Sequence, residues 1–398
     1  MNDKYLGYFS KSINDFKNEN RYRKFVNISR IRGEFPYAVN NKNNQKIVLW
    51  CSNDYLGMGQ NQDAITEAKK ALELYGVGSG GTRNISGTSK LNFELEKEIC
   101  NIFNSESSLT FVSGYVANDA TIQSLSKIIP NLVIFSDEKN HASIISGVKN
   151  SRLEKNIFKH NDLKNLEELL KKYPISTPKI IIFESIYSMD GDFGNIKEII
   201  SLAKEYNAMT FCDEVHAVGL YGERGGGLCQ ELGLDKEIDI IQGTLAKAYG
   251  CIGGFITGKS EIIDAVRLNS SGFIFSTSLP PSICAAAKTN ISHLINSSHE
   301  RSLHKIIVNK LKVKLKEANI NIIENKSHII SIRIGNARRA EEISKLLLER
   351  HNIYIQHINY PTVAINDERL RITATPLHNE KMIDDLIISL KEAINSTK

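Results

Sequence analysis

The sequence lacks the features that mark membrane-spanning, disulfide-bonded and metal-binding proteins. No apolar run reaches the ~18 residues that a membrane-spanning helix needs. None of its six cysteines forms a C-x-x-C pair, and no group of His and Cys residues has the spacing of a zinc site. Scattered single cysteines are typical of reduced thiols. We therefore expect a cytoplasmic protein without a membrane partner and without a bound metal.

The sequence also lacks a strong excess of charge. Its net charge is +5 over 398 residues, and the charges are spread evenly. We expect no nucleic-acid partner, because such proteins need a concentrated basic surface. Residues 1–24 carry charges of both signs, which is not the composition of a secretory signal or a transit peptide.

What the chain has instead is an alternation of apolar strands and amphipathic helices. The clearest predicted strands are 108–112, 132–135, 179–183 and 207–213, with helical patterns between them. Such alternation is typical of a mainly parallel sheet with helices on both faces. A chain of 398 residues is long enough for two packed domains. The predicted fold class is therefore α/β.

The pattern changes after the Pro280-Pro281 pair, where shorter strands begin to interleave with helices. This is typical of a small α+β domain. The predicted strands are 320–323, 328–334, 353–357 and 369–373, and the predicted helices are 338–350 and 379–395. We expect an N-terminal arm at 1–50, a large domain at 51–285 and a small C-terminal domain at 286–398.

One lysine is unusual in its neighbours. Lys247 lies between Ala246 and Ala248 in the segment GTLAKAYG, with further glycines close by. Lysines on a solvated helix face normally have polar neighbours, so this one is predicted to be partly buried. Burial disfavours the ammonium and lowers the pKa of the amine, which suits a lysine that forms a Schiff base. The alternative is an ordinary lysine in a turn of small residues.

An acidic residue upstream favours a cofactor site. Asp213 ends the predicted strand 207–213, and open α/β sheets place ligand-binding groups at strand ends. Pyridoxal phosphate needs a lysine for its Schiff base and a carboxylate beside its pyridine nitrogen. Asp213 and Lys247 supply both on consecutive sheet elements. A strand-end Asp taken alone is more often a helix cap or a turn residue.

Glycines and hydroxyl groups near strand ends predict a phosphate site. Gly114 opens a helix directly after the strand 108–112, so free backbone N–H groups meet a helix N-terminus there. The segment 78–88, GSGGTRNISGT, contains four glycines, which let the backbone approach a ligand closely. The hydroxyls of 271–281, SGFIFSTSLPP, are a further candidate, with a polar turn as the alternative. His141 also follows a predicted strand, where a surface histidine is the alternative.

Together these segments resemble the α-oxoamine synthases, which are pyridoxal-phosphate enzymes of fold type I. The resemblance extends from Arg21 to the C-terminal helix. It is carried by CSNDYLGMGQ, GSGGTRNISGT, SDEKNHASI, IFKHNDL, FESIYSMDGD, DEVHAVGLYGERGGG, GTLAKAYG, GFIFSTSLPP and RLRITATPLH, in that order. Within the family the chain looks like the bacterial members that make 5-aminolevulinate, the first committed precursor of haem.

The resemblance implies both a fold and a reaction. The fold is that of fold type I transferases, a mainly parallel central sheet with helices on both faces and a smaller C-terminal α+β domain. The reaction is the condensation of glycine with succinyl-coenzyme A, which releases coenzyme A and carbon dioxide. The family also implies a homodimer with the active site at the subunit interface.

The resemblance assigns roles to single residues as well. Lys247 is implied as the Schiff-base lysine and general base, Asp213 as the partner of the pyridine nitrogen, and His141 as the ring that stacks on the cofactor. Further cofactor contacts are implied for Gly114, Tyr115, Ser188, His216 and Thr244, and for Ser276 and Thr277 from the other subunit. Arg371 is implied to bind the glycine carboxylate. Positions that match succinyl-coenzyme A or substrate contacts are Arg23, Asn53, Thr82, Asn84, Ser136, Lys155 and Thr362.

The alternatives within the family differ in their substrates. They are 2-amino-3-ketobutyrate ligase, 8-amino-7-oxononanoate synthase and serine palmitoyltransferase. Arg23, Thr82 and Asn84 favour a donor with a second carboxylate over these. A non-catalytic scaffold is the alternative from another class. The chain departs from the family pattern at 89–92, where many relatives carry a histidine at the position of Asn92, so the role of this segment stays open.

Overall fold

The computed structural model describes residues 3–397, which divide into two compact units. The first unit combines the residues up to Ser52, the segment Met189–Gly191 and the residues from Lys305 onward. The second unit comprises Asn53–Ser188 and Asp192–His304. The expected N-terminal arm is thus part of the first unit. The expected boundary lies at 285/286, whereas the two units divide after His304, within the helix His299–Glu317.

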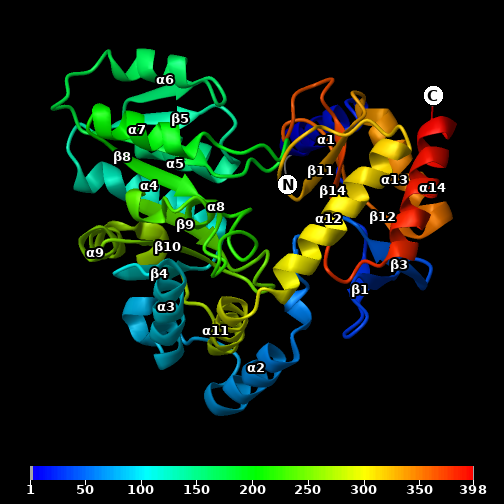
Figure 1. The fold of residues 1–398 in the computed structure, drawn as a ribbon, viewed down its shortest axis with the longest axis horizontal. Helices are drawn as coiled ribbons and strands as arrows, with labels where there is room; N and C mark the ends of the chain where they lie inside the picture. Colours follow the sequence, from blue (N-terminus) through cyan, green and yellow to red (C-terminus); the bar gives the residue numbers. More distant parts are fainter. Residues whose placement is uncertain (1–2, 398) are drawn as a thin grey trace. The chain divides into compact units, whose positions relative to one another are not determined.

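The second unit is built on a sheet of seven strands (Figure 1). They are β4 (Ser107–Phe111), β5 (Val133–Asp137), β6 (Lys155–Phe158), β7 (Lys179–Glu184), β8 (Ala208–Asp213), β9 (Ile240–Thr244) and β10 (Gly254–Gly258). Their order across the sheet is β4-β10-β9-β8-β7-β5-β6. The strand β10 is antiparallel to both neighbours, and the other pairs are parallel. The predicted mainly parallel sheet is confirmed.

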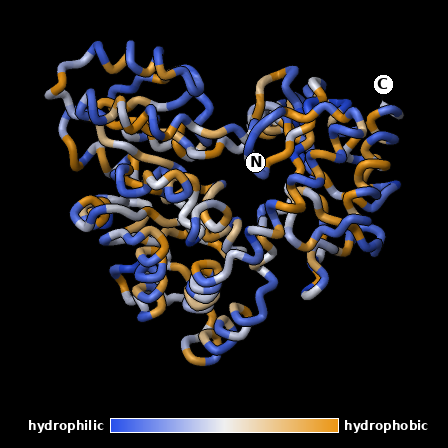
Figure 2. The backbone as a smooth tube through the Cα atoms, viewed as in Figure 1, coloured by the Kyte–Doolittle hydropathy of each residue, from blue (hydrophilic) through white to orange (hydrophobic). Residues whose placement is uncertain are grey.

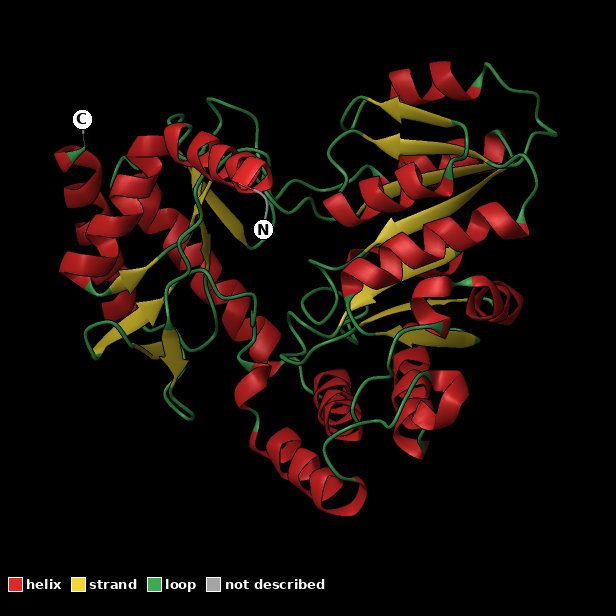
Figure 3. Cartoon of the chain, turned by 180° about the vertical axis from the view of Figure 1, so that it is seen from behind, coloured by secondary structure: helices red, strands yellow, loops and turns green. Residues whose placement is uncertain are grey.

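Helices surround this sheet, as the view from behind shows clearly (Figure 3). The longer ones are α2 (Gln62–Tyr75), α3 (Lys90–Phe103), α4 (Gly114–Ile128), α5 (Ala142–Ser151), α6 (Leu163–Leu170), α7 (Ile196–Glu205), α9 (Ser260–Asn269) and α11 (Pro281–Asn296). The shorter ones are η1 (Met58–Gln60), α8 (Leu228–Glu231), η3 (Asp235–Glu237) and α10 (Ser271–Ile274), and Arg83–Gly87 (η2) forms an irregular turn.

The sequence explains why these strands are central. The strand β7 reads Lys-Ile-Ile-Ile-Phe-Glu and is buried at every position, as expected for a parallel strand covered on both faces. Ile182, Phe211 and Ile256 from three strands share one hydrophobic core with residues of the flanking helices. Hydrophobic and hydrophilic residues are interspersed along the helices (Figure 2). In α7 the buried residues Ile196, Ile199, Ile200 and Ala203 recur at helical spacing and form one apolar stripe.

Two helices begin at the carboxyl edge of this sheet with side-chain caps. Ser113 follows β4, and its hydroxyl accepts a hydrogen bond from the N–H of Val116, so α4 begins at Gly114. His141 follows β5, and its ring nitrogen Nδ1 accepts a hydrogen bond from the N–H of Ser143, so α5 begins at Ala142. Both helix N-termini therefore open where β7, β8 and β9 end.

The first unit holds two small sheets. One has the order β1-β2-β3-β12 and the other the order β11-β14-β13. The strands are β1 (Ile28–Arg30), β2 (Tyr37–Asn40), β3 (Gln45–Leu49), β11 (Ile329–Arg333), β12 (Ile353–Tyr354), β13 (His357–Ile358) and β14 (Arg369–Thr373). The helices are α1 (Asp3–Asn18), α13 (Ala337–His351), α14 (Glu380–Ser396) and, from Lys305 onward, α12 (His299–Glu317). Trp50, Leu311, Leu370 and Leu386 belong to one core that joins the sheets and helices.

The predicted strand 320–323 is wrong. In that stretch Ile322 makes only an isolated bridge with Ile332, so no ladder extends.

A second unexpected feature is the segment Met189–Gly191, which belongs to the first unit. Arg369 donates to the carbonyl of Met189 at 3.1 Å and forms an ion pair with Asp190 at 2.5 Å.

Within residues 3–397, the structure contains no helix that is both long enough and apolar enough to cross a membrane.

Candidate active site

A cavity of about 110 Å³ lies at the carboxyl edge of the seven-stranded sheet. Seven predicted site residues line it together, namely Gly114, Tyr115, His141, Asp213, His216, Thr244 and Lys247. Four lining residues were not predicted, namely Asn118, Ser143, Glu184 and Val215. The predicted set thus meets in one place, although its members come from four separate segments of the sequence.

Asp213 ends β8 and is buried at the floor of this cavity. Its oxygen Oδ1 accepts a hydrogen bond from the N–H of Val215 at 2.8 Å, and Oδ2 accepts one from Asn118 Nδ2 at 2.7 Å. Burial raises the pKa of Asp213, while these hydrogen bonds and the charges of His141 and Lys247 act in the opposite direction. The carboxylate is therefore held in one orientation by two donors.

His141 caps α5 and stands beside Tyr115, with the two rings edge to face and their centroids 6.4 Å apart. Although the residue is exposed toward the cavity, the imidazole is partly enclosed by protein. That enclosure lowers the pKa of His141; Asp213 opposes the change and Lys247 adds to it. The ring is therefore neutral at physiological pH.

Two further residues of the site could not be found from local sequence patterns. Tyr55 is fully buried, and its hydroxyl lies 2.8 Å from Nδ1 of His216. Glu184 ends β7 directly beside Asp213 and accepts a hydrogen bond from the backbone N–H of His141 at 2.5 Å. Burial and the neighbouring charge of Asp213 raise the pKa of Glu184 well above its ordinary value. The two buried carboxyl groups therefore each disfavour ionisation of the other.

The cavity has the groups that pyridoxal phosphate needs. Lys247 is half-buried in the turn after β9, and Asp213 and His141 line the same cavity. At the N-terminus of α4, the backbone N–H groups of the first turn have no partner within the helix and suit a phosphate. A Cβ added to Gly254 would lie 2.5 Å from Gly114, so the absence of a side chain there lets β10 reach this turn.

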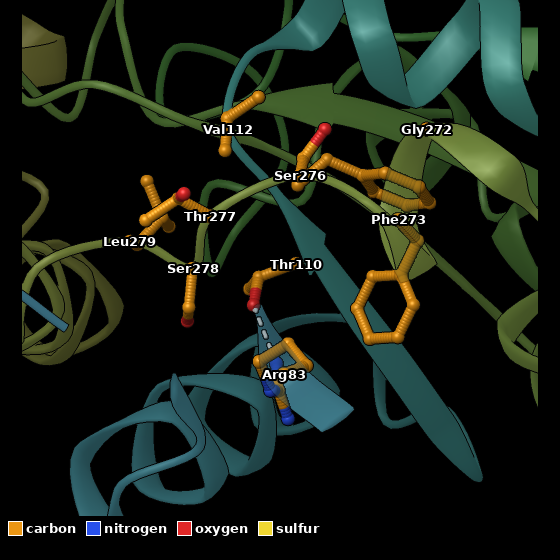
Figure 4. A pocket seen from close by; sticks show the side chains of 10 residues that line it. Arg83, Thr110, Val112, Gly272, Phe273, Ser276, Thr277, Ser278 and Leu279 are labelled. Atoms are coloured by element: carbon orange, nitrogen blue, oxygen red, sulfur yellow. Dashed lines mark hydrogen bonds between the residues drawn. The ribbon is translucent and has the colours of Figure 1, made fainter. Parts of the chain in front are cut away.

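Ser276 and Thr277 lie elsewhere in the second unit. They line a separate small cavity with Arg83, Thr110 and Phe273 (Figure 4). Thr277 forms an isolated antiparallel bridge with Thr82, so two segments with predicted ligand contacts are joined to each other. Within one chain, neither Ser276 nor Thr277 is among the residues that line the Lys247 cavity.

The other predicted residues are dispersed. In the second unit, Ser136 is buried in β5, Ser188 is half-buried, and Asn53, Asn84 and Lys155 are exposed. In the first unit, Arg371 is buried in β14, and Arg23 and Thr362 are exposed. The roles of these residues stay predictions. Asn92, in the segment that departs from the family pattern, is buried and donates to the hydroxyl of Ser278 at 3.2 Å.

One buried cluster has the composition of a metal site but not free ligand atoms. Cys212, Glu214 and Cys229 lie close enough to share an ion. However, Glu214 already accepts hydrogen bonds from the backbone N–H groups of Leu228 and Cys229 and from the hydroxyl of Ser185. These donors use the carboxylate oxygens to anchor the N-terminus of α8, and we assign the cluster no metal.

A histidine clamp fixes the loop that precedes α7. His160 Nδ1 lies 2.9 Å from Asp137 of β5, and Nε2 lies 2.6 Å from Asp192. Burial lowers the pKa of His160, but the hydrogen bonds and charges of the two carboxylates outweigh it and raise the pKa to about 9. The imidazolium therefore bridges two carboxylates at neutral pH.

This clamp should make stability depend on pH in the alkaline range. Because the folded-state pKa is raised, the stabilising charge is fully present below the unfolded value of about 6.5 and is lost as pH rises through about 9. We expect the charged clamp to contribute about 1–2 kcal/mol, after allowance for solvent screening. Urea unfolding of wild type and His160→Asn between pH 6.5 and 9.5 measures it. Lys70→Met, which breaks an exposed pair with Glu67, is the control and should show no such trend, because that pair raises the pKa of Lys70 and keeps the amine charged across this range. A constant gap between wild type and His160→Asn would contradict the clamp.

Comparison with known proteins agrees with this geometry. The sequence pattern of the family described as aminotransferase class I and II matches residues 45–390. A 5-aminolevulinate synthase of Rickettsia bellii is 53% identical over 382 residues, which cover 96% of this chain and 92% of that protein. One of Bradyrhizobium diazoefficiens is 47% identical over 388 residues, which cover 97% and 95%. Among solved structures, the Sphingomonas wittichii serine palmitoyltransferase has a TM-score of 0.91 and 26% identity, and covers 99% of this chain and 98% of that one. The chain therefore belongs to the aminotransferase class I and II family and, within it, to the 5-aminolevulinate synthases.

Proposed function

We propose that the protein condenses glycine with succinyl-coenzyme A to give 5-aminolevulinate, coenzyme A and carbon dioxide, as the first step of tetrapyrrole synthesis. The observation that carries the proposal is the meeting of Lys247, Asp213 and His141 in one cavity beside a helix N-terminus. Relatives that carry the name of this activity match nearly the whole chain. Serine palmitoyltransferase, one of the alternatives, shares the fold at much lower identity.

Each residue has a stated task in this reaction. Bound pyridoxal phosphate supplies a ring that can take up the electron pair left when the glycine α-carbon loses a proton. The carboxylate of Asp213 holds a proton on the pyridine nitrogen by charge and hydrogen bonding. The amine of Lys247 binds the cofactor covalently and, once released, removes the glycine α-proton as general base. The N–H groups of Gly114 and Tyr115 at the start of α4 would hold the phosphate, and the ring of His141 would stack on the cofactor ring.

The two substrate carboxylates need positive partners, because an unpaired charge in a partly buried site is costly. We assign the glycine carboxylate to Arg371. For the succinyl carboxylate we assign Arg23, whose guanidinium offers two donors in one plane, with Thr82 and Asn84 adding neutral hydrogen bonds. The remaining polar positions, Asn53, Ser136, Lys155 and Thr362, are assigned to the coenzyme A portion or the substrate.

A panel of acyl-coenzyme A donors with glycine tests the function, and Arg23→Leu tests the donor assignment. Wild type should consume succinyl-coenzyme A in strong preference to butyryl-coenzyme A. In Arg23→Leu, kcat/KM for succinyl-coenzyme A should fall by about 10- to 150-fold, the value of one charge-assisted hydrogen bond. Glycine KM should change far less. Equal loss for both donors would show that Arg23 only supports the N-terminal segment, and preference for another thioester in wild type would refute the proposed substrate.

We propose further that the enzyme is a homodimer with shared active sites. Ser276 and Thr277, assigned to the cofactor phosphate, do not line the Lys247 cavity of their own chain. Large apolar side chains near the Thr82–Thr277 bridge are strongly exposed: Phe275 is 78% and Ile85 71% exposed. Apolar residues gathered on a surface are typical of protein–protein contacts. A second copy of the chain would cover them and receive the Thr277 hydroxyl.

Subunit complementation tests the shared site. Lys247→Ala lacks the essential amine, and Thr277→Glu places a carboxylate where the phosphate is proposed to bind. Each homodimer should be inactive. Heterodimers should regain activity, because one of their two sites combines the intact Lys247 of one chain with the intact Thr277 of the other. Heterodimers that form but stay inactive would refute the shared site.

We also propose a cytoplasmic location. All six cysteines are free thiols, and three of them, Cys212, Cys229 and Cys284, are buried in the second unit. A chain of this size without disulfides is typical of a reducing compartment.

A further inference from the structure

Two residues outside the predicted site connect its main groups to each other. Asn118 lies on the first turns of α4, and Ser143 lies on the first turn of α5; each is only 1% exposed. Asn118 Nδ2 donates to Asp213 Oδ2 at 2.7 Å and to Ser143 Oγ at 3.0 Å. Ser143 Oγ in turn lies 2.7 Å from Nδ1 of His141. A continuous chain of hydrogen bonds therefore runs from Asp213 to His141.

The direction of each bond in this chain follows from the donors available. The backbone N–H of Ser143 can only donate, and it points to Nδ1 of His141 at 3.2 Å. Nδ1 must therefore accept, and it carries no proton. Because Nδ1 carries no proton, the Ser143 hydroxyl must donate to it, while the same hydroxyl oxygen accepts from Asn118. The ring proton of neutral His141 is then on Nε2.

The orientation of the Asn118 amide is also determined. If the amide were flipped, its carbonyl oxygen would face the carboxylate of Asp213 and repel it. In the observed orientation, Oδ1 is buried without a hydrogen-bond partner among the described residues. An unpaired buried acceptor is unfavourable, so the two bonds of the NH₂ group must outweigh it.

We infer that Asn118 and Ser143 are positioning residues that hold Asp213 and His141 in register and keep His141 in the neutral form with its proton on Nε2. The inference rests on the proposed binding of pyridoxal phosphate at this cavity. A histidine protonated on both nitrogens would compete with the pyridine nitrogen for the single negative charge of Asp213. The N–H and the hydroxyl of Ser143 both donate to Nδ1 of His141, so this nitrogen takes up no proton. The negative charge of Asp213 therefore stays available to the cofactor.

Few other charged and titratable groups surround the chain of hydrogen bonds from Asp213 through Asn118 and Ser143 to His141. Glu184 accepts a hydrogen bond from the backbone N–H of His141, not from its ring. Lys247 follows β9 and lines the same cavity. The hydrogen bonds of the Asn118 and Ser143 side chains run to Asp213, to His141 and to each other, so changing either residue removes a donor to this pair.

Matched variants separate positioning from packing. Asn118→Leu keeps the branched shape of the side chain and removes the donor, and Ser143→Ala removes the hydroxyl, which Ser143→Thr restores. Thr121→Val is the control: it lies on α4, is 0% exposed, and its hydroxyl has no partner among the described residues. Three readouts apply, namely the pyridoxal-phosphate dissociation constant of the apo-protein, kcat and KM, and ¹⁵N-histidine spectra of the apo-protein. The His141 signals are assigned by their loss in His141→Asn.

We expect Asn118→Leu to weaken cofactor binding by about 10- to 100-fold, because a donor to a charged group is lost. Ser143→Ala should lower kcat by about 3- to 10-fold with little change in glycine KM, and Ser143→Thr should recover it. Wild-type His141 should show the Nε2–H form, and Asn118→Leu a mixture of tautomers. Thr121→Val should match wild type in all three.

Several results would overturn the inference. One is that Asn118→Leu and Ser143→Ala bind the cofactor and turn over like Thr121→Val. Another is a wild-type His141 that carries its proton on Nδ1. If Asn118→Leu does not fold, the Ser143→Ala and Ser143→Thr pair decides, and equal kcat in the two overturns the inference. If wild-type protein binds no pyridoxal phosphate, the proposed function fails, while the apo-protein spectra still decide the tautomer.

Discussion

Lys247→Ala should abolish turnover while leaving the fold intact. Lys247 lies in the turn after β9 and is the only lysine among the residues that line the described cavity. Without its amine the cofactor loses its covalent attachment and glycine loses its general base, so kcat should fall by at least about 10³-fold. The side chain is half-buried and its neighbours Ala246 and Ala248 are small, so its removal leaves little strain. Steady-state kinetics and circular dichroism measure the two effects.

Chemical trapping identifies the attachment point directly. Borohydride reduction of wild-type protein with pyridoxal phosphate, followed by peptide mapping, should label the peptide that contains Lys247. Lys149→Ala, which removes an exposed lysine of α5, should keep both the label and the activity. Label on any other lysine, or turnover by Lys247→Ala near the wild-type rate, would overturn the assignment.

The fold could be predicted where periodicity and strand ends leave local signals. The run Lys-Ile-Ile-Ile-Phe of β7 can only be a covered strand, and the helices between strands follow from their apolar stripes. The strand predicted at 320–323 was wrong because an apolar run forms a strand only where a partner strand pairs with it along its length. Ile322 forms a single bridge, with Ile332. The Pro280-Pro281 pair suggested a boundary, but Pro281 begins α11, a position that proline favours.

The site could be predicted only in part, because only some of its residues leave a local signal in the sequence. Asp213, His141 and Lys247 follow strands, and their residue types carry the chemistry, so sequence alone indicated them. Asn118 and Tyr55 carry no such signal. Asn118 acts because it meets Asp213 across 95 positions of sequence, and Tyr55 because it meets His216 across 161. Such meetings depend on tertiary structure, which one sequence without an alignment does not specify.

Breaking the buried ion pair between Arg83 and Glu96 should strongly destabilise the second unit. The two guanidinium nitrogens lie 2.7 and 3.1 Å from the carboxylate oxygens, and the side chains are only 10% and 12% exposed. Figure 4 shows Arg83 reaching Thr110, whose N–H also donates to Glu96. Arg83→Met leaves the Glu96 charge buried without its partner, which costs about 3–5 kcal/mol. The urea midpoint at fixed protein concentration measures this loss.

A double variant shows whether the cost comes from the unpaired charge. In Arg83→Met with Glu96→Gln, no charge is left buried, and the glutamine oxygen still accepts from the N–H of Thr110. This double variant should therefore be more stable than Arg83→Met alone by at least about 1 kcal/mol. Lys90→Met, which breaks an exposed pair on the same helix, should cost less than about 1 kcal/mol. If the effects of Arg83→Met and Glu96→Gln on the free energy of unfolding simply add up in the double variant, the argument is contradicted. Because Arg83 directly follows Thr82, which bridges Thr277, the single variant should also weaken the proposed phosphate contact, and Lys90→Met should not.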